Sequence, residues 1–249
     1  MLEKKKVLEI GITDATENEI LKYIITSLEK KEEKYYIVTP NPEILVYSNS
    51  HSSFKTILNN ARIALCDGIG IIWAGKILGQ GVKHRVGGTD FIEKVCSEVC
   101  KKPITVGFLG GRGSVAEKTA ECLQKKYPGL KVVFAASEWP ENSSKFIRST
   151  SSGQSSKLSI DILFVAFGFP KQEEWIAQNL DKIPVKMAMG VGGAFDYISG
   201  NVRRAPVWIR NIGLEWLYRL IRQPWRIKRQ LALLEFIFLV LKKKFTPSK

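Results

Sequence analysis

Asp67 is the residue best placed for chemistry, because it follows the apolar run that ends at Cys66 and directly precedes Gly68. A carboxylate at the carboxyl end of a buried strand is partly removed from water, so burial raises its pKa, whereas a nearby cation lowers it. Such a group can act as a general base toward a hydroxyl. The ordinary alternative is that Asp67 and Gly68 only form a turn.

Two further features could hold phosphate. Arg85 would either balance the charge of Asp67 or bind a phosphate, and the alternative is a solvated loop arginine. Gly111 begins a Gly-x-Gly-x-x-Ala match that ends at Ala116. The acid that a dinucleotide fold needs at the end of the next strand is not cleanly present, which disfavours a dinucleotide site. Gly111 then serves either tight-turn packing or contact with the diphosphate of a nucleotide sugar.

Several catalytic motifs are missing from the sequence, and their absence disfavours several classes of enzyme. No Asp-x-Asp pair is available to hold Mg²⁺ or Mn²⁺ on a nucleotide diphosphate, and no Gly-x-Ser-x-Gly motif occurs. The sequence has only two histidines, so hydrolase triads and zinc hydrolases are disfavoured. We therefore expect no metal and no other cofactor, and we expect helix N-termini with Arg or Lys to stabilise a departing diphosphate.

The four cysteines are expected to be reduced thiols of the core, since the N-terminus shows no secretory signal and predicts a cytoplasmic location. Cys96 and Cys100 have the spacing of two zinc ligands on a helix. Neither histidine is near them and no second pair follows, so a zinc site is disfavoured.

Apolar, β-branched runs alternate with segments of helical period along the chain. This alternation predicts an α/β fold with a mostly parallel, Rossmann-like sheet and helices on both faces. Thr16 and Glu19 have the spacing of a capping box and predict a helix start. The Ser-rich segment 140–160 is expected to form a surface helix and a loop. The predicted strands cover Val7–Ile12, Tyr35–Val38, Ile63–Cys66, Ile104–Leu109, Val132–Ala135, Ile162–Phe167 and Val185–Val191.

Glycines and short polar residues recur directly after the predicted strands. In open α/β sheets, ligands bind beyond the carboxyl ends of the strands, so this edge of the sheet is the predicted site. The candidate residues that follow strands are Thr39, Asn41, Asp67, Gly111, Gln172 and Asp196.

The positive charge is concentrated near the C-terminus. Residues 203–249 carry twelve Lys or Arg and two acidic residues, which accounts for +10 of the net charge of +14. We therefore predict an α/β catalytic domain over residues 1–202 and a basic, amphipathic helical appendage over residues 203–249. The apolar run Leu231–Leu241 is too short for a bilayer core, which needs about 20 residues. A helix lying in the headgroup region of an anionic membrane is expected instead.

Six blocks at the strand ends occur in one order along the chain. They begin at Thr39, Cys66, Arg85, Gly107, Phe167 and Gly190 and read Thr-Pro-Asn-Pro-Glu, Cys-Asp-Gly-Ile-Gly, Arg-Val-Gly-Gly-Thr-Asp, Gly-Phe-Leu-Gly-Gly, Phe-Gly-Phe-Pro-Lys-Gln-Glu and Gly-Val-Gly-Gly-Ala-Phe-Asp. Together they resemble the WecG/TagA/CpsF family of bacterial glycosyltransferases over nearly the whole chain. Their shared order is far more specific than any single block.

The resemblance implies inverting, metal-independent transfer of N-acetylmannosamine from UDP to undecaprenyl-diphosphate-linked N-acetylglucosamine. This reaction is the committed step in synthesis of the wall teichoic acid linkage unit. By motif, Asp67 is implied as the base that deprotonates the acceptor hydroxyl. The residues implied to line the pocket around the diphosphate and the sugars are Thr39, Arg85 and Gln172, and the residue implied to help hold the uridine is Asp196.

The resemblance also implies that the appendage binds the membrane and completes the site. The protein is then expected to be peripheral on the inner face of the plasma membrane, next to its lipid-linked acceptor. Arg219, Arg226 and Arg229 are the candidates for reaching the leaving diphosphate.

Two alternatives stay open from the residues alone. The same class of enzyme with another donor, UDP-N-acetylmannosaminuronic acid or UDP-glucose, also fits, because the sequence gives no direct view of the sugar pocket. A nucleotide- or phosphate-binding protein that docks on a membrane or a nucleic acid also fits the basic tail. The resemblance favours no nucleic-acid partner, and the sequence leaves open whether the chain forms a homo-oligomer.

Overall fold

The computed structural model describes residues 2–30, 33–140, 147–149, 155–157, 159–224 and 227–246. The chain divides into two compact units, each of which is described by itself. The first unit comprises Met1–Ile20, Val38–Gly88 and Val202–Lys249, and the second comprises Leu21–Ile37 and Thr89–Asn201. The residues predicted as an appendage therefore group with segments from the N-terminal third of the chain. The division into a catalytic domain and an appendage is functional and stays a prediction.

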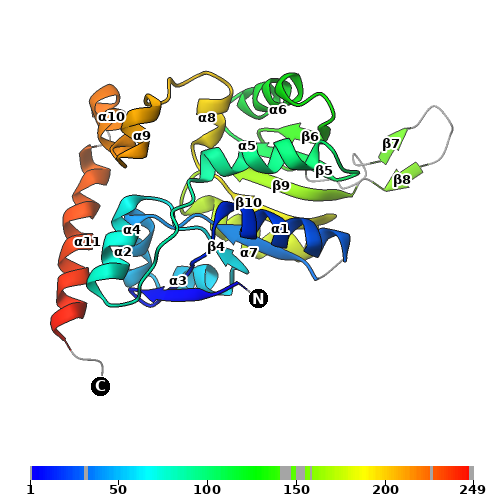
Figure 1. Cartoon of the computed structure of the whole chain (residues 1–249). Coiled ribbons are helices and arrows are strands. Elements are labelled where there is room, and N and C mark those ends of the chain that lie inside the picture. Colours follow the sequence, from blue (N-terminus) through cyan, green and yellow to red (C-terminus); the bar gives the residue numbers. More distant parts are fainter. Residues whose placement is uncertain are drawn as a thin grey trace. The chain divides into compact units, whose positions relative to one another are not determined.

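A mostly parallel six-stranded sheet, most of which belongs to the second unit, is the largest element of the fold (Figure 1). Its strands are β3 (Tyr35–Val38), β4 (Ile63–Ala64), β5 (Thr105–Gly110), β6 (Lys131–Ala136), β9 (Ile160–Ala166) and β10 (Val185–Gly190). The strand order is β4-β3-β10-β9-β5-β6. β10 pairs in parallel with β3 and β9, and β5 pairs in parallel with β9 and β6. The predicted α/β class is thereby confirmed.

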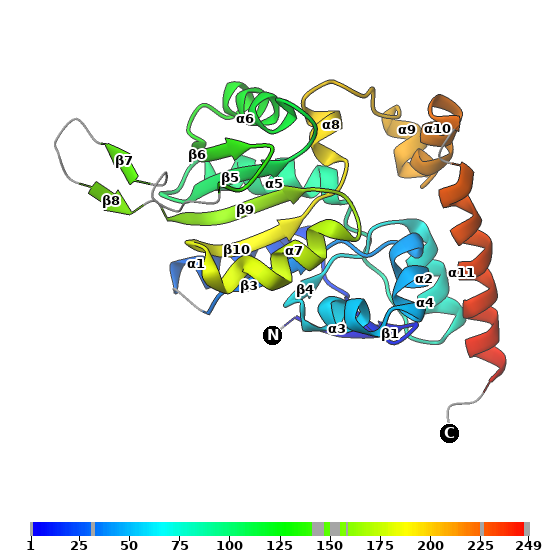
Figure 2. The ribbon, with the colours of Figure 1, turned by 180° about the vertical axis from the view of Figure 1, so that it is seen from behind.

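Helices cover both faces of the sheet in the second unit. α5 (Gly88–Val99) lies in front of the sheet in Figure 1, and α7 (Lys171–Asn179) lies in front of it in the opposite view of Figure 2. α7 packs on β9 and β10 and buries Ile176 completely. α6 (Val115–Lys126) packs on β5, β6 and the short α8 (Ala194–Ile198).

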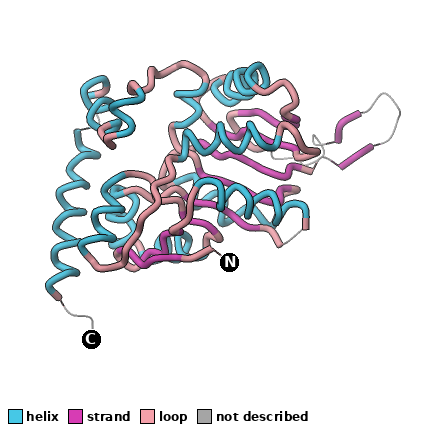
Figure 3. Tube along the Cα trace, viewed as in Figure 1, coloured by secondary structure: helices cyan, strands magenta, loops and turns pink. Residues whose placement is uncertain are grey.

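The first unit joins helices from the two ends of the chain. α11 (Ile227–Phe245) packs against α2 (Pro42–Ser50) and α4 (Ile69–Ile77), and it buries Phe236 and Val240. Figure 3 shows that helices dominate the C-terminal part of the chain. This unit also contains α3 (Ser52–Asn60), α9 (Val207–Asn211) and α10 (Glu215–Arg222).

Gly70 permits the close approach of three helices in the first unit. A Cβ atom at Gly70 would lie 2.8 Å from Pro42 Cγ of α2 and 3.8 Å from Phe236 Cε1 of α11. Any larger side chain would push α4 away from both neighbours. The start of α4 therefore packs directly against α11.

α11 contains the apolar run that the sequence predicts as a surface-lying helix, and it ends in three exposed lysines, Lys242 to Lys244. Within the described ranges, every helix is too short or too polar to cross a bilayer.

The predicted strand Val7–Ile12 is wrong, because the chain reverses inside it. β1 (Lys4–Val7) and β2 (Ile10–Thr13) form an antiparallel hairpin joined by Leu8 and Glu9. Both linking residues have positive φ, 47° and 69°, as a tight hairpin turn of the primed type requires. Asn-Gly or Asp-Gly usually marks such a turn, so Leu-Glu conceals it.

The Ser-rich segment 140–160 is not helical where the structure describes it. β7 (Ile147–Ser149) and β8 (Ser155–Lys157) form an antiparallel pair. Ser and Thr side chains compete for backbone hydrogen bonds and so disfavour a helix. The predicted surface helix is therefore wrong for these residues, and the remaining positions between 141 and 158 lie outside the described residues.

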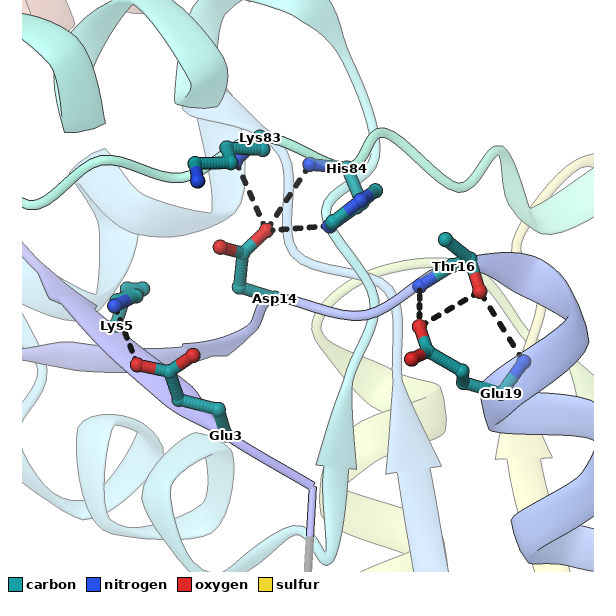
Figure 4. Close-up of polar contacts among 7 residues, drawn as sticks. All are labelled: Glu3, Lys5, Asp14, Thr16, Glu19, Lys83 and His84. Carbon is teal, nitrogen blue, oxygen red and sulfur yellow. Dashed lines mark hydrogen bonds and ion pairs between the residues drawn. The ribbon is translucent and has the colours of Figure 1, made fainter.

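α1 (Glu17–Glu29) begins where the sequence predicts. The Thr16 N–H donates to Glu19 Oε2 at 2.8 Å, and the Glu19 N–H donates to Thr16 Oγ1 at 3.3 Å (Figure 4). This reciprocal pair gives acceptors to amides that lack partners inside the helix. The predicted capping box is confirmed.

Candidate active site

The backbone places Asp67 at the point where β4 gives way to α4. The Leu65 N–H donates to Val38 O at 2.8 Å, and the Asp67 N–H donates to Pro40 O at 3.0 Å. Gly68 follows with a φ of 107°, a conformation that favours glycine, and serves as the N-cap of α4. Asp67 is thus held beside the segment that carries Thr39, at the carboxyl end of the strand.

The Asp67 side chain is partly buried and accepts a hydrogen bond from the Gly88 N–H. Its pKa is raised to about 6, first because burial disfavours the charged form and second because Glu215 is near. Arg85, the Gly88 N–H and Arg204 act in the opposite direction and favour the carboxylate. The Asp67 carboxyl is therefore ionised near neutral pH and accepts a proton more readily than an ordinary aspartate does.

Gly88 brings Thr39 and Asp67 close together. A Cβ atom at Gly88 would lie 3.3 Å from Thr39 Cγ2 and 4.0 Å from Asp67 Oδ2. Thr39 itself is buried. Asn41, predicted to bind substrate, caps α2 through its side chain, since Asn41 Oδ1 accepts a hydrogen bond from the Ile44 N–H at 3.0 Å.

The C-terminal segment reaches the surroundings of Asp67 through Arg204, Arg210 and Glu215. The exposed Arg85 donates from Nη2 to Arg210 O at 3.2 Å. Arg204 Nε lies 3.1 Å from Glu215 Oε1, in an ion pair that acts on the pKa of Asp67 through both members. The sequence pattern does not single out Arg204 and Arg210, because a long basic segment offers many equivalent arginines, and it does not show the pairing of Glu215 with an arginine eleven residues away.

Of the three arginines that the resemblance implies, the structure describes the side chain of Arg219. Arg219 Nε donates to Gln223 Oε1 at 3.4 Å, near the end of α10. Arg226 lies outside the described residues, as does the side chain of Arg229. Their contact with a diphosphate stays a prediction.

Asp14 anchors the loop that carries Arg85. Its Oδ1 accepts hydrogen bonds from the N–H of Lys83 at 2.9 Å and of His84 at 3.0 Å, and His84 Nδ1 lies 3.0 Å from the same oxygen (Figure 4). Burial raises the pKa of Asp14, but these hydrogen bonds outweigh burial and leave the pKa below its ordinary value. Asp14 was not predicted, because its partners lie about 70 residues away in the chain.

Gln172 lies in the second unit and is held at both ends of its amide. Its Nε2 donates to Glu173 Oε1 at 2.8 Å, and its Oε1 accepts from the Gly192 N–H at 2.9 Å. A Cβ atom at Gly190 would lie 3.0 Å from Gln172 Nε2, so the end of β10 packs tightly on this amide. Gln172 therefore fixes the loop after β10 within its own unit.

Glu173, which the sequence pattern did not single out, is a fully buried carboxyl. Its second oxygen, Oε2, has no hydrogen-bond partner among the described residues. Burial raises the pKa of Glu173 to about 7, although the hydrogen bond from Gln172 lowers it. A carboxyl in this setting is partly protonated at neutral pH.

Gly111 and Asp196, the other predicted contacts of the second unit, lie in different settings. Gly111 has a φ of 81°, and a Cβ atom there would lie 2.8 Å from Val115 Cβ. The Gly111 N–H donates to Ala166 O at 3.1 Å, so the tight turn itself requires a glycine here, and a contact of Gly111 with substrate stays a prediction. Asp196 lies in the first turn of α8 and is partly exposed.

The described residues include no group of three or more His, Cys, Asp or Glu side chains gathered as metal ligands. All four cysteines are free thiols. Cys66 and Cys96 are buried as predicted, whereas Cys122 is exposed on α6 and the prediction of a core thiol is wrong for it.

Comparison with known proteins gives one family. A model described as the glycosyl transferase WecG/TagA/CpsF family matches residues 5–249. The match includes both compact units and thus every described candidate residue.

Curated relatives share one name, N-acetylglucosaminyldiphosphoundecaprenol N-acetyl-beta-D-mannosaminyltransferase. The protein of Bacillus spizizenii strain W23 is 27% identical over 248 residues, which cover 100% of this chain and 95% of the relative. The protein of Bacillus subtilis strain 168 is 30% identical over 228 residues, which cover 88% of this chain and 87% of the relative. The protein of Staphylococcus aureus strain MRSA252 is 30% identical over 209 residues, which cover 84% and 80%.

Replacing Asp14 tests its role as the anchor of the Arg85 loop. Asp14→Ala removes the acceptor of two backbone N–H groups, and we expect hydrogen exchange at Lys83 and His84 to accelerate at least about tenfold. Asp14→Asn keeps an oxygen acceptor and should retain most of the protection. Equal exchange in wild type and Asp14→Ala would contradict the anchoring role.

Replacing Glu173 tests the cost of ionising it. The folded protein binds the proton more tightly than the unfolded chain, so Glu173 lowers stability as pH rises from its ordinary pKa toward about 7. Glu173→Gln stays neutral, and we expect it to exceed wild type in unfolding free energy by about 1–3 kcal/mol at about pH 8 but not at about pH 4. Urea unfolding measures the difference, with the partly exposed neighbour variant Glu174→Gln as control. The same pH dependence in all three proteins would contradict this account.

Proposed function

Because the chain belongs to the WecG/TagA/CpsF family of glycosyl transferases, we propose that it transfers N-acetylmannosamine from UDP-N-acetylmannosamine to undecaprenyl-diphosphate-linked N-acetylglucosamine. The names of the relatives support this donor and this acceptor. The product is the disaccharide of the wall teichoic acid linkage unit. The observation that carries the proposal is the half-buried Asp67, with a pKa of about 6 and arginines beside it.

The proposed reaction is a single displacement. Asp67 takes the proton of an N-acetylglucosamine hydroxyl while the oxygen forms a bond to the anomeric carbon of the donor sugar. The bond between that carbon and the UDP oxygen breaks, and UDP leaves with the electron pair. Attack from the face opposite the leaving group inverts the anomeric configuration. The raised pKa of Asp67 suits a base that must accept a proton during the reaction.

Arginines are proposed to bind the departing diphosphate in place of a metal ion. Arg85 is exposed next to Asp67, and the first unit also contains Arg219. Fixed cations stabilise charge that develops on a leaving group. Thr39 and Asn41 are further proposed contacts in this unit, and Gly111, Gln172 and Asp196 are proposed substrate contacts in the second unit.

We propose that the protein is peripheral on the cytoplasmic face of the plasma membrane and that residues 203–249 act as the membrane-binding appendage. On α11, Leu234 and Phe238 are exposed, and Lys242 to Lys244 lie at its end. Apolar side chains with adjacent lysines are the composition of an interfacial helix. The acceptor keeps its polyprenyl chain in the bilayer, so a membrane-bound enzyme meets it at the surface.

The donor is tested by offering the protein a set of UDP-sugars with a short-chain lipid-diphosphate-N-acetylglucosamine acceptor. We expect product only with UDP-N-acetylmannosamine, with the mass of the disaccharide and an inverted linkage by anomeric NMR. UDP-glucose and UDP-N-acetylmannosaminuronic acid serve as comparison donors, and EDTA should leave the rate unchanged. Preferred use of a comparison donor would refute the substrate while leaving the enzyme class intact.

Asp67→Asn tests the base. We expect the variant to fold normally and to lose acceptor-dependent UDP release by about 100-fold or more. In the wild-type protein kcat/KM should fall as pH drops through about 6, because protonated Asp67 cannot act as a base. Asp181→Asn, at an exposed position of the second unit, is the control. An Asp67→Asn variant within a few-fold of wild type would remove Asp67 from this role.

A further inference from the structure

α4 is apolar on both its inner and its outer side. Ile71 and Ala74 face the interior and are buried, whereas Ile69, Trp73 and Ile77 remain 38%, 65% and 39% exposed. The spacing of four residues places the three exposed side chains on one stripe of the helix. A surface helix of a soluble domain normally carries polar residues on its outer stripe. This stripe therefore needs an apolar partner.

The stripe of α4 belongs to a larger apolar surface within the first unit. Across the described part of the chain, all exposed large apolar side chains lie on α4, α9, α10 and α11 or in the turns between α9, α10 and α11. α4 packs beside α11, as the two opposite views agree (Figures 1 and 2). Gly213, between α9 and α10, approaches α4 so closely that a Cβ atom there would lie 3.0 Å from Ile69 Cγ2. The stripe and the C-terminal helices are thus in direct contact.

The charges around the stripe favour anionic lipid as its partner. Lys76 of α4 and the following Lys83 are exposed, and Lys242 to Lys244 are exposed on α11. Lysine side chains near an anionic membrane surface are attracted to it. A second copy of the chain would bring the same positive charges together, which is unfavourable. Tryptophan, the most exposed member of the stripe, prefers the boundary between lipid and water.

We propose that α4 is a second membrane-binding element, whose Ile69, Trp73 and Ile77 enter the same lipid surface as the C-terminal helices. The inference rests on the membrane docking proposed above and adds that the part of the chain carrying the base touches lipid directly. α4 begins two residues after Asp67. The base is therefore held near the headgroup layer, at the depth where a lipid-linked sugar emerges from the bilayer.

Site-specific fluorescence tests the proposal in the full-length chain. Cys100 and Cys122 are replaced by Ser, and a single cysteine is introduced by Trp73→Cys and labelled with an environment-sensitive nitrobenzoxadiazole dye. Phe238→Cys on α11 reports on the appendage, and Thr56→Cys on the polar outer side of α3 is the control. The probe is a vesicle of equimolar phosphatidylglycerol and phosphatidylcholine. We expect a several-fold rise in emission at 73 and 238, quenched by acyl-chain nitroxides, and no change at 56.

The possible results separate this inference from the docking on which it rests. A response at 238 without one at 73 would overturn the role of α4 and leave the appendage as the only membrane anchor. No response at either position, together with no co-sedimentation of the unlabelled protein, would refute membrane docking itself and the role of α4 with it.

Substitution of Trp73 in the otherwise native chain gives an independent readout. We expect Trp73→Glu to weaken vesicle binding at least tenfold and to slow transfer to a vesicle-embedded acceptor, while transfer to a short-chain acceptor in solution is unchanged. Trp73→Phe should keep most of both. Sedimentation velocity without lipid tests whether a second copy of the chain covers the stripe instead. If the wild-type protein is a dimer and Trp73→Glu dissociates it, the stripe is a contact between copies and the proposal is overturned.

Discussion

The opposition between burial and charge at Asp67 is the constraint on which the candidate site depends. A carboxylate fully surrounded by water would be a weak base, and one fully buried without cations would be protonated and inactive. Asp67 lies between these limits, because burial raises its pKa while Arg85 and the Gly88 N–H favour the charged form. The end of β4, the loop that carries Arg85, and Gly88 at the start of α5 must therefore keep their positions around the Asp67 carboxyl.

Much of this arrangement can be predicted from the sequence because it depends on local patterns. Strand runs of β-branched residues locate the edge of the sheet, and the topology of parallel strands then places Thr39 and Asp67 beyond their ends. The capping box of Thr16 and Glu19 is likewise local, because its members are three positions apart in the chain. In each case the structure follows from residues that are close together in the chain, so the pattern can be recognised in a single sequence.

The rest depends on contacts between distant residues or on conformations with no sequence signal. The hairpin at Leu8 and Glu9 needs positive φ at two residues that seldom adopt it, so the alternating pattern predicts one strand where the chain reverses. Asp14 reaches a loop about 70 residues further along the chain. Glu173 is fully buried whereas Glu174 beside it is partly exposed, and the sequence alone does not distinguish the two. Such features depend on the folded arrangement of the chain, and no local sequence pattern predicts them.

The ion pair between Arg204 and Glu215 has an evolutionary consequence. Its two members act on the pKa of Asp67 in opposite directions, Glu215 raising it more strongly than Arg204 lowers it, so the loss of either one would shift that pKa. Drift at these two positions is therefore constrained as a pair, and homologous chains should lose or keep both residues together. A change confined to one of the two would alter the acidity of the Asp67 carboxyl without any substitution of Asp67 itself.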